Sequence, residues 1–559
     1  MGIDEFYNEL KEHKDHINSL SYKEQKQYIT KLKHKLSKEH KIKKLPTDIE
    51  IFLNTGIKLI TKPTRTISGV SVIAIMTKPL RCPHGKCICC PGGLNSEYGD
   101  VPQSYTGNEP ASMRAIRNDY DPYLQVFNRL EQYVAIGQNF DKIELIIMGG
   151  TFPSYDIDYQ NDFIMNAFKA MNDFSDYFFI DGKLDFEKYL EFFEMPSEMK
   201  DEARLKRIKT KVLNLKQGNT TLEQEKTKNE NSNIRCVALA IETRPDYAMQ
   251  DQIINMLNQG TTRVELGVQS TDDKVLTFLN RGHTVKDSID STRLMKDSFL
   301  KVGYHMMLGL KDKEKEMFDD LFTNDDFKPD ALKIYPLVII KGTELYELWK
   351  QKKFSPIHEE DAIKLIAEIK SKIPEYVRIM RVERDIPHTE IIDGIKSTNI
   401  RQYVHKYMKK HDMACNCIRC KEIKNEKIDE TKIVYDKLFY NASKGKEVFI
   451  SAKYNDKLVG FLRLRKPYQP FIENLKDNVV GIRELHVYGK AINIGKSSEK
   501  SSQHKGIGKR LMEMAEDIAF NEFNANKIAV ISGIGVRNYY RKLGYYLDGY
   551  YMFKDRNSK

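Results

Sequence analysis

Apolar stretches of membrane-spanning length are missing from this 559-residue sequence, since no run approaches the roughly 20 residues that a helix needs to cross a bilayer. Its first segment, Met1 to Lys11, is charged and lacks the apolar centre of a signal peptide. Cysteine is also scarce, with eight residues in the chain, which excludes the disulfide framework of small secreted proteins. These absences predict a cytoplasmic protein that has no contact with a membrane.

Positive charge is in excess, because 90 Lys and Arg residues face 79 Asp and Glu residues and give a formal net charge of +11. Part of the excess lies in a lysine-rich N-terminal segment, which favours a polyanionic partner such as RNA or DNA. A solvated helix face is the alternative for any such run. The lysines concerned are Lys31, Lys33, Lys35, Lys38, Lys41, Lys43 and Lys44.

The length of the chain predicts two or three domains rather than one. Residues 1–61 place Leu, Ile and Tyr at near-helical spacing among lysines and predict a basic helical region. Residues 62–374 contain short apolar runs that alternate with helical stretches, which is typical of a parallel sheet with crossover helices. The predicted fold class is therefore α/β, with six strands in a partial barrel. The strands are expected at 70–76, 143–148, 234–241, 263–268, 301–307 and 331–335.

Three further segments complete the predicted organisation. Residues from about 172 to 233 are rich in Lys, Glu and Asn, offer little to bury, and are expected to form an insertion that is helical or partly disordered. Residues 375–429 are interpreted as a metal-binding linker. Residues 430–559 begin a second α/β pattern and predict a separate domain, with strands at 448–454, 458–465 and 482–488.

The first cysteine group follows the first predicted strand, with Cys82, Cys87 and Cys90 at gaps of four and two residues. Three thiolates on a short loop can hold three irons of a 4Fe-4S cluster, and the fourth iron can then chelate the amino and carboxylate groups of S-adenosylmethionine (SAM). A zinc site with His84 as the fourth ligand is the alternative. The position of the loop at the mouth of a barrel favours the cluster. Cys89, in the same loop, is interpreted as a non-ligand.

Polar and glycine-containing turns follow three of the predicted strands, where the active-site residues of barrels lie. Glycines allow a backbone to approach a ligand closely, and carboxylate, guanidinium and amide groups can bind the ribose and amino acid ends of SAM. The residues expected to bind SAM are Gly149, Gly150, Thr151, Glu242, Arg244 and Gln269.

The second cysteine group, Cys415, Cys417 and Cys420, lies in the linker after a basic stretch that contains His405 and His411. Three closely spaced thiols with nearby histidines favour a structural zinc site, in which either histidine is the candidate fourth ligand. A second iron-sulfur cluster and three unligated thiols are the alternatives.

The C-terminal domain contains two features of a cofactor site. The pattern at residues 503–509 opens a predicted helix with glycines, so that backbone amides and the helix dipole favour a pyrophosphate such as that of CoA. A strand at 528–532 then leads to Asn538-Tyr-Tyr-Arg-Lys-Leu-Gly-Tyr545, which resembles the end of the GCN5-related N-acetyltransferase fold. By that resemblance Tyr540 lies near the thioester sulfur of acetyl-CoA.

Short motifs from about residue 62 to the end of the chain resemble, in order, those of the catalytic subunit of Elongator. This family joins a radical-SAM domain, a zinc-bearing linker and an acetyltransferase-like domain. The segment after His305-Met-Met lacks the prolines that are usual in the family. Besides the cysteine groups, the motifs include Arg65-Thr-Ile-Ser-Gly69, Tyr105-Thr-Gly107, Met148-Gly-Gly-Thr-Phe152, Glu242-Thr-Arg-Pro-Asp246, Arg281-Gly-His-Thr284, Arg384-Asp-Ile-Pro387 and Glu484-Leu-His-Val-Tyr-Gly489.

The resemblance implies an acyltransferase that converts the wobble uridine of tRNA into 5-carboxymethyluridine with a 4Fe-4S cluster, SAM and acetyl-CoA. A deoxyadenosyl radical would take a hydrogen from the acetyl methyl group, the carbon radical would add to carbon 5 of the uracil, and the thioester would then be hydrolysed. Tyr540 and Lys142 are the implied catalytic residues. The implied partner is tRNA, held by the basic N-terminus and linker, with other Elongator-type subunits and a second copy of the chain as further candidates. The implied acetyl-CoA contacts are Lys142, Glu484, Leu485, His486, Val487, Ile507, Gly508, Lys509 and Tyr540.

Two other functions compete with this one. A protein lysine acetyltransferase would transfer acetyl groups to peptides without a reductant, and the first cysteine loop would be idle. A non-catalytic tRNA-binding subunit would bind RNA and turn over neither cofactor.

Overall fold

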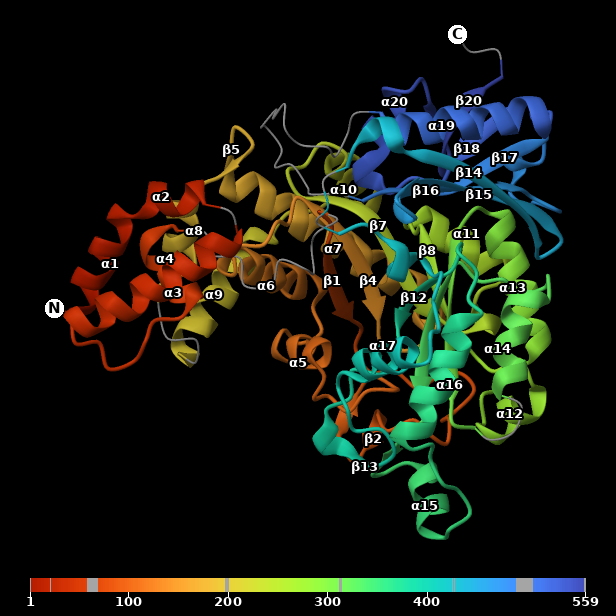
Figure 1. Ribbon diagram of the computed structural model, residues 1–559, viewed down its shortest axis with the longest axis horizontal. Coiled ribbons are helices and arrows are strands. Elements are labelled where there is room, and N and C mark those ends of the chain that lie inside the picture. Colours follow the sequence, from red (N-terminus) through yellow and green to blue (C-terminus); the bar gives the residue numbers. More distant parts are fainter. Residues whose placement is uncertain are drawn as a thin grey trace.

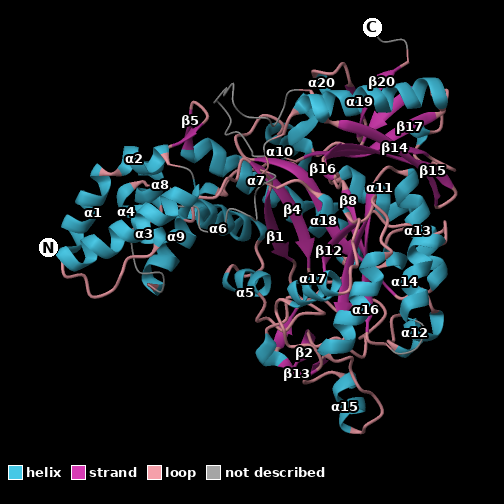
Figure 2. Cartoon of the chain, viewed as in Figure 1, coloured by secondary structure: helices cyan, strands magenta, loops and turns pink. Residues whose placement is uncertain are grey.

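The computed structural model describes most of the chain and shows a helical lobe, a central barrel-like sheet and a second sheet (Figures 1 and 2). The predicted boundary at 61/62, the motif residues 65–68 and residue 489, and the pattern at 503–505 lie outside the described residues. The described ranges are 2–20, 22–57, 69–196, 201–310, 314–424, 426, 428–488 and 506–556.

The N-terminal lobe contains four helices, α1 (Gly2–Glu12), α2 (Lys14–Ser19), α3 (Tyr22–Glu39) and α4 (Asp48–Thr55). Along α3, the buried Ile29, Leu32 and Leu36 recur at helical spacing and pack against residues of α1 and α4. Lys33 also falls on this face, four residues after Ile29. Its ammonium is therefore buried and pairs with Asp48 at 3.0 Å, which corrects its place in the exposed basic run.

The central sheet is parallel throughout, in the order β1-β4-β7-β8-β9-β10-β12. The predicted partial barrel is confirmed, but the described residues form seven strands in it rather than the six that were predicted. The seventh strand was missed because its sequence, Arg378-Ile-Met-Arg381, is short and half basic. The strands are β1 (Ser71–Met76), β4 (Lys142–Met148), β7 (Arg235–Thr243), β8 (Arg263–Gln269), β9 (Lys301–Leu308), β10 (Ala331–Pro336) and β12 (Arg378–Arg381).

Helices cover the outer face of this sheet, and the loop after β1 carries the small hairpin β2 (Gly93–Ser96) and β3 (Gly99–Val101) (Figure 1). A second short pair, β11 (Ile339–Ile340) and β13 (Ile391–Asp393), lies near that hairpin in the view. The helices of this region are α5 (Pro110–Arg117), α6 (Pro122–Ala135), α7 (Ile157–Phe178), α11 (Gln250–Asn258), α12 (Asp273–Phe278), α13 (Val285–Asp297), α14 (Glu314–Thr323), α15 (Glu344–Lys350), α16 (Glu359–Ser371), α17 (Ile400–Lys410) and α18 (Ile418–Lys421).

The polar segment before β7 is mainly helical in its described part, with one short strand pair, and it buries more than its composition predicts. Its last helix, α10, ends in Asn229, whose buried amide donates to Asn172 Oδ1 at 2.8 Å and to the Ile234 oxygen at 3.0 Å. Polar groups can be buried here because they satisfy one another. The elements are β5 (Phe179–Ile180), β6 (Lys183–Leu184), α8 (Phe186–Phe192), α9 (Glu202–Leu215) and α10 (Leu222–Asn229).

The second sheet lies across the starts of the barrel strands, since the arrows of β1 and β4 point away from it (Figure 1). Its order is β14-β15-β16-β17-β18-β20-β19, with β17 and β18 the parallel pair. The predicted second α/β unit is thereby confirmed. Its elements are β14 (Val434–Ala442), β15 (Gly445–Tyr454), β16 (Lys457–Lys466), β17 (Val479–Val487), α19 (Ile507–Asp517), β18 (Lys527–Val530), α20 (Arg537–Arg541), β19 (Tyr546–Asp548) and β20 (Tyr551–Asp555).

Buried ion pairs join the second sheet to the barrel domain, through Asp330 just before β10 and Asp297 at the end of α13. Arg483 Nη2 lies 2.5 Å from Asp330 Oδ1 and 3.0 Å from Glu447 Oε2, and Arg465 Nη2 lies 2.6 Å from Asp297 Oδ1. All five side chains are fully buried. Because an unpaired buried charge is strongly destabilising, these pairs require the two sheets to stay in this relative position. Within the described ranges no helix combines the length and the apolar character needed to cross a membrane.

Candidate functional site

One cavity of about 2340 Å³ is lined by residues of the barrel and of the second sheet. Cys82 and Gly150 line it beyond the ends of barrel strands, and Lys142 lines it at the start of β4. Tyr540 lines it from the second domain. Because β4 has seven residues, the cavity extends over roughly 20 Å of strand length. It therefore brings both predicted cofactor sites into one continuous space.

The first cysteine group surrounds one end of this cavity, and each sulfur has a different polar neighbour. Cys82 Sγ lies 3.9 Å from Thr151 Oγ1, Cys87 Sγ lies 3.2 Å from His84 Nε2, and Cys90 Sγ accepts from the Ser104 backbone N–H at 2.9 Å. The neighbours come from three different parts of the chain. All three cysteines line the cavity, as does Cys89.

Burial governs the protonation of these thiols. It raises the pKa of Cys82 to about 11, an effect to which the neighbouring Cys90 adds, and it raises the pKa of Cys90. Metal or cluster binding requires the thiolate, so occupation of the loop must release protons. Burial also raises the pKa of Cys89 to about 12. Burial and the nearby Arg244 and Arg281 lower the pKa of His84 to about 3, so its ring is neutral at pH 7.

The turn after β4 requires its glycines. Gly149 has φ +125°, and a Cβ there would lie 2.2 Å from Thr77 Oγ1. Gly150 has φ +111°, and its Cβ would lie 4.0 Å from Cys82 Sγ. Both conformations are strained for other residues. The backbone of Gly149 to Thr151 therefore passes directly beside the cysteine loop, where a ligand of the loop would contact it.

The remaining predicted SAM residues differ in whether the polar groups of their side chains are already hydrogen-bonded within the protein. Glu242 accepts from Tyr105 Oη at 3.2 Å and lies 3.2 Å from Lys333 Nζ. Arg244 is fully committed within the protein, because its guanidinium donates to Asp246 at 2.7 and 2.9 Å. In contrast, the buried Oε1 of Gln269 has no hydrogen-bond partner among the described residues. It is thus an acceptor that a ligand can satisfy.

Three residues of the site had no role in the prediction. Arg281 Nη1 lies 3.6 Å from Cys87 Sγ, and its buried Nε lacks a partner within the described ranges. Ser104 contacts Cys90, and Arg384 Nη2 donates to the Ser104 oxygen at 2.9 Å. Arg281 and Arg384 belong to motifs that carried the family resemblance. Those motifs could have indicated that the two arginines belong to the site, although a motif does not show which atoms they contact.

The other end of the cavity lies where β17 and β18 separate. Their register pairs run from Val479 to Ile482, whereas Leu485, His486 and Val487 pair with β16 on the other side and line the cavity. Unpaired strand edges offer backbone donors and acceptors to an extended ligand. Burial lowers the pKa of His486 to about 4, and its Nε2 has no partner in the part of the chain that the structure describes.

The start of α19 lies at the same end. Gly506, with φ +102°, is its N-cap, and Gly508 and Lys509 line the cavity. Ile507 is buried under this turn. The first amides of a helix have no partner within it and attract anions. Tyr540, on α20, is 6% exposed, so its contact with bulk solvent is slight.

Glu484 also lies here, but its carboxylate is occupied. It pairs with Lys301 of β9 and accepts from Arg463 Nε at 2.8 Å. Burial acts to raise its pKa, yet Lys301 and Arg463 lower it to about 2. The side chain therefore ties β17 to the barrel, and the Glu484 backbone is the part available to a ligand.

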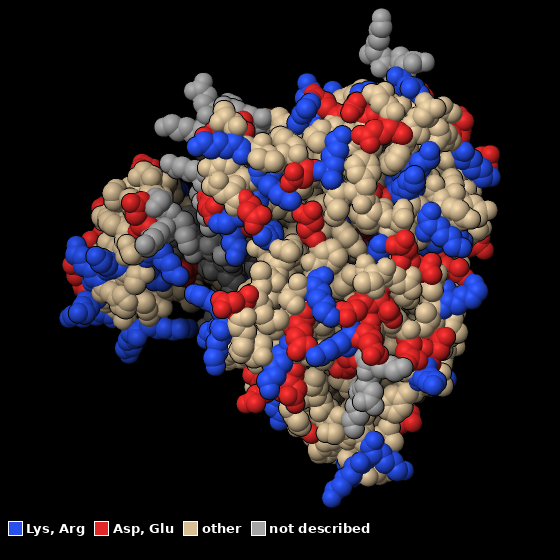
Figure 3. All heavy atoms as spheres, turned by 45° about the vertical axis from the view of Figure 1, so that its right-hand side comes forward, with Lys and Arg blue, Asp and Glu red and all other residues tan. Residues whose placement is uncertain are grey.

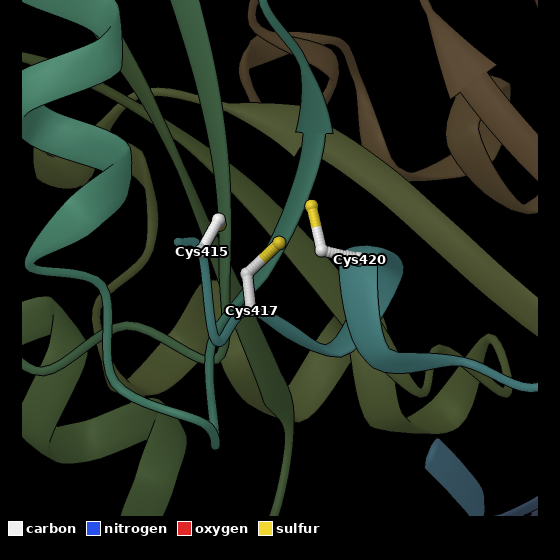
Figure 4. Close-up of side chains that lie close together, drawn as sticks. All are labelled: Cys415, Cys417 and Cys420. Atoms are coloured by element: carbon white, nitrogen blue, oxygen red, sulfur yellow. The ribbon is translucent and has the colours of Figure 1, made fainter. Parts of the chain in front are cut away.

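The second cysteine group is compact. The sulfurs of Cys415, Cys417 and Cys420 all lie within 4.8 Å of one another, with Cys420 on α18 (Figure 4). The buried Lys370 Nζ donates to Cys415 Sγ at 3.4 Å and to Cys420 Sγ at 3.5 Å. Thiols of Cys415 and Cys420 donate to Cys417 and hold its pKa well below the usual range. The arrangement can hold one metal ion.

Neither predicted histidine joins this group within the described part of the chain. His411 is exposed, and its Nδ1 bonds to the Tyr407 oxygen at 2.8 Å. His405 is exposed and lines the cavity instead. His405 lies on α17 and His411 directly after it, and His405 is near enough to Cys417 and Lys370 for both to act on its pKa. The structure therefore groups the three thiols without a histidine, and a histidine as the fourth ligand stays a prediction.

Basic side chains surround these sites. Apart from Lys33, the predicted lysines of the N-terminal lobe are exposed, and Lys and Arg gather along the lower side of this lobe in Figure 3. Exposed cations of this kind attract phosphate backbones. The basic residues that line the cavity from residues 375–429 are Arg378, Arg381, Arg384, Arg401, Arg419 and Lys424.

The sequence matches three protein families over most of its length. The Radical SAM superfamily matches residues 78–323, and the Radical_SAM C-terminal domain matches residues 329–410. The Acetyltransferase (GNAT) family matches residues 417–545. The two radical-SAM matches contain the barrel strands from β4 to β12, and the GNAT match contains the second sheet from β14 to β18 together with α19 and α20.

Relatives match nearly the whole chain. The tRNA uridine(34) acetyltransferase of Methanocaldococcus jannaschii is 47% identical over 508 residues, which cover 88% of this chain and 86% of the relative. Elongator complex protein 3 of Homo sapiens is 39% identical, with 89% and 86% covered. The solved structure of the archaeal Methanocaldococcus infernus Elp3 with an N-terminal deletion superposes with a TM-score of 0.70 and 41% identity, covering 88% of this chain and 100% of that chain.

Proposed function

The chain belongs to the family of tRNA uridine(34) acetyltransferases and Elongator complex protein 3, and from this premise we propose that it forms 5-carboxymethyluridine at the wobble position of tRNA. SAM and acetyl-CoA are the proposed co-substrates. The observation that carries this proposal is the single cavity lined by both sets of site residues. Two independent activities would not require such a shared space.

Cys82, Cys87 and Cys90 are proposed to hold a 4Fe-4S cluster, which when bound would supply the one-electron chemistry for SAM cleavage. The fit rests on three thiols that face the cavity and on the orphaned Gln269 Oε1 and Arg281 Nε beside them. The Gly149–Thr151 backbone would confine SAM against the loop. These residues would bind and orient SAM.

Acetyl-CoA is proposed to bind between β17 and the start of α19. The unpaired edge of Leu485 to Val487 would hold its extended arm, and the amides at Ile507 to Lys509 would bind its pyrophosphate. Tyr540 and Lys142 are the proposed catalytic residues, because both line the cavity where the acetyl end would enter the barrel. The buried phenol of Tyr540 can donate to the thioester, since burial raises its pKa above the usual range.

A single metal ion, with zinc as the first candidate, is proposed at Cys415, Cys417 and Cys420. Zinc-thiolate bonds of about 2.3 Å place sulfurs roughly 3.8 Å apart, which suits thiols that already lie close together. Lys370 would offset part of the negative charge of three thiolates. The basic cavity rim and the exposed N-terminal lysines are proposed to bind tRNA phosphates, with further subunits as additional partners.

The test is turnover by full-length protein that is purified without oxygen and then reduced. We expect 5′-deoxyadenosine from SAM, acetyl-CoA consumption that tRNA stimulates, and carboxymethyluridine in the tRNA. Acetyl transfer to peptides with SAM untouched would instead support a lysine acetyltransferase. Binding of tRNA without consumption of either co-substrate would support a non-catalytic subunit.

A further inference from the structure

The end of α10 contacts the short helix α20, whose Tyr540 lines the cavity. Glu230 follows α10, and its side chain is 8% exposed. Its Oε1 lies 3.0 Å from Arg537 Nη1, and its Oε2 lies 2.5 Å from Arg541 Nη1. Asn538 Nδ2 donates to the Glu230 backbone oxygen at 3.2 Å. One residue of the barrel domain thus holds α20 at three points.

Glu230 is itself fixed in place by the residue before it. The Asn229 amide donates to Asn172 of α7 and to the Ile234 oxygen, and its Oδ1 accepts from the Cys236 N–H at 2.7 Å. These bonds tie the end of α10 both to α7 and to the start of β7. The Glu230 carboxylate therefore presents its oxygens from a rigid support.

The loop that leads into α20 is seated against the same strand. A Cβ on Gly533 would lie 2.1 Å from the Val237 oxygen, and one on Gly535 would lie 2.5 Å from Arg235 Cβ. The two backbones therefore touch where β7 begins. At its other end, β7 leads to Glu242 and the SAM side of the cavity. The position of α20 is thus set by the barrel as well as by its own domain.

We propose that Glu230 is a positioning residue for the acetyl-CoA site. It does not line the cavity itself, so it acts through the two arginines and Asn538 that it holds. The Arg537 Nε is buried without a partner among the described residues, which makes the carboxylate its main compensation. The 172–233 segment thereby acquires a function, because its last helix orients Tyr540. The inference rests on the proposed function, since it places acetyl-CoA at this end of the cavity.

The test measures CoA affinity by calorimetry in the full-length Glu230→Gln variant. We expect the Kd for CoA to rise about tenfold, because two arginines lose their anion and α20 loses its anchor. The KM for acetyl-CoA should rise in parallel, whereas SAM cleavage without acetyl-CoA should stay at the wild-type rate. A merely structural role would lower the unfolding temperature and leave the Kd, measured well below that temperature, unchanged.

Two further variants make the result specific. Glu223→Gln alters the same helix α10 at a side chain that is 70% exposed, and it should leave CoA binding unchanged. Arg541→Gln should weaken CoA binding, and its combination with Glu230→Gln should be no weaker than the worse single variant. If Glu230→Gln does not fold, Asn538→Ala removes one anchor without unpairing a charge and should raise the Kd about threefold.

Wild-type affinity for CoA in Glu230→Gln, or in Asn538→Ala where Glu230→Gln does not fold, would overturn the inference and leave the proposed function intact. Failure of the wild-type protein to bind CoA would overturn both together. The two failures are therefore distinguishable.

Discussion

The two cysteine groups of this protein differ in geometry as well as in spacing, which has gaps of four and two residues in the first group and of one and two residues in the second. The sulfurs of Cys415, Cys417 and Cys420 converge within 4.8 Å and, among the described residues, form the one such group of metal-binding side chains. In the first group each sulfur has a separate neighbour, Thr151 for Cys82 and Ser104 for Cys90. Convergence suits one ion with about 2.3 Å bonds, whereas separated thiols suit a larger cluster. The two groups thus present their thiols in different arrangements.

The largest effect is expected from Cys87→Ala. Loss of one thiolate removes a ligand from the cluster, so SAM cleavage should fall to the background of the assay. The measurement is 5′-deoxyadenosine formation by anaerobic, reduced protein. Calorimetry with CoA supplies the control, because the Kd should not change. Retained SAM cleavage would show that the first group does not hold the catalytic cluster.

Cys417→Ser should act on the second group alone. We expect about one metal ion per chain to be lost and the unfolding temperature to fall, because the metal's binding energy also stabilises the linker. The iron of the first group should remain. Elemental analysis and thermal unfolding measure both effects, with the buried thiol variant Cys236→Ser as the control for metal content. Loss of iron rather than zinc would reassign the second group to an iron-sulfur cluster.

Lys370→Met should have a smaller effect on the same group. The variant keeps all three thiols but removes the buried cation beside Cys415 and Cys420. We expect a chelator to remove the metal about tenfold faster, as is typical when a partner of the ligands is lost. Lys372→Met is the matched control, because its side chain is 53% exposed. Equal release rates for the two variants would contradict this role of Lys370.

The smallest effect is expected from Cys89→Ser. The family resemblance assigns the cluster to Cys82, Cys87 and Cys90, so Cys89 should not bind iron. Burial raises the pKa of Cys89 as it does those of Cys82 and Cys90, so the protonation of the thiols does not distinguish it from the ligands. Iron content and SAM cleavage should match those of the wild-type protein. Cys90→Ser, one residue later, serves as the contrasting variant and should lose the cluster. Iron loss in Cys89→Ser would place this residue among the ligands.

Much of the fold was predictable because buried strands leave a strong local signal. The apolar runs at β1, β4 and β7 each correspond to a strand of the structure. The seventh strand, β12, was not predicted because its two arginines do not pack in the core. Both line the cavity, and Arg378 also forms an ion pair with Glu422. The burial of Lys33 could have been predicted from its position four residues after Ile29, on the same face of the helix.

The site was predictable in its residue types and not in its distances. Motifs pointed to Cys82 and Tyr540, but the cavity that joins them depends on how two sheets pack, which local sequence does not encode. The same limit hid Glu230, which lies more than three hundred positions before Arg537 and Arg541. It also hid Lys370 beside the second cysteine group. Long-range contacts of this kind appear only once the chain is folded.

The central claim is that SAM is cleaved and acetyl-CoA reacts within one cavity. The most direct measurement supplies acetyl-CoA with a deuterated methyl group to the reduced protein with SAM and tRNA, and determines the mass of the 5′-deoxyadenosine formed. The account predicts deuterium in 5′-deoxyadenosine and in the new carboxymethyl group of tRNA. Deoxyadenosine without deuterium, formed at the same rate, would contradict it and separate the two chemistries.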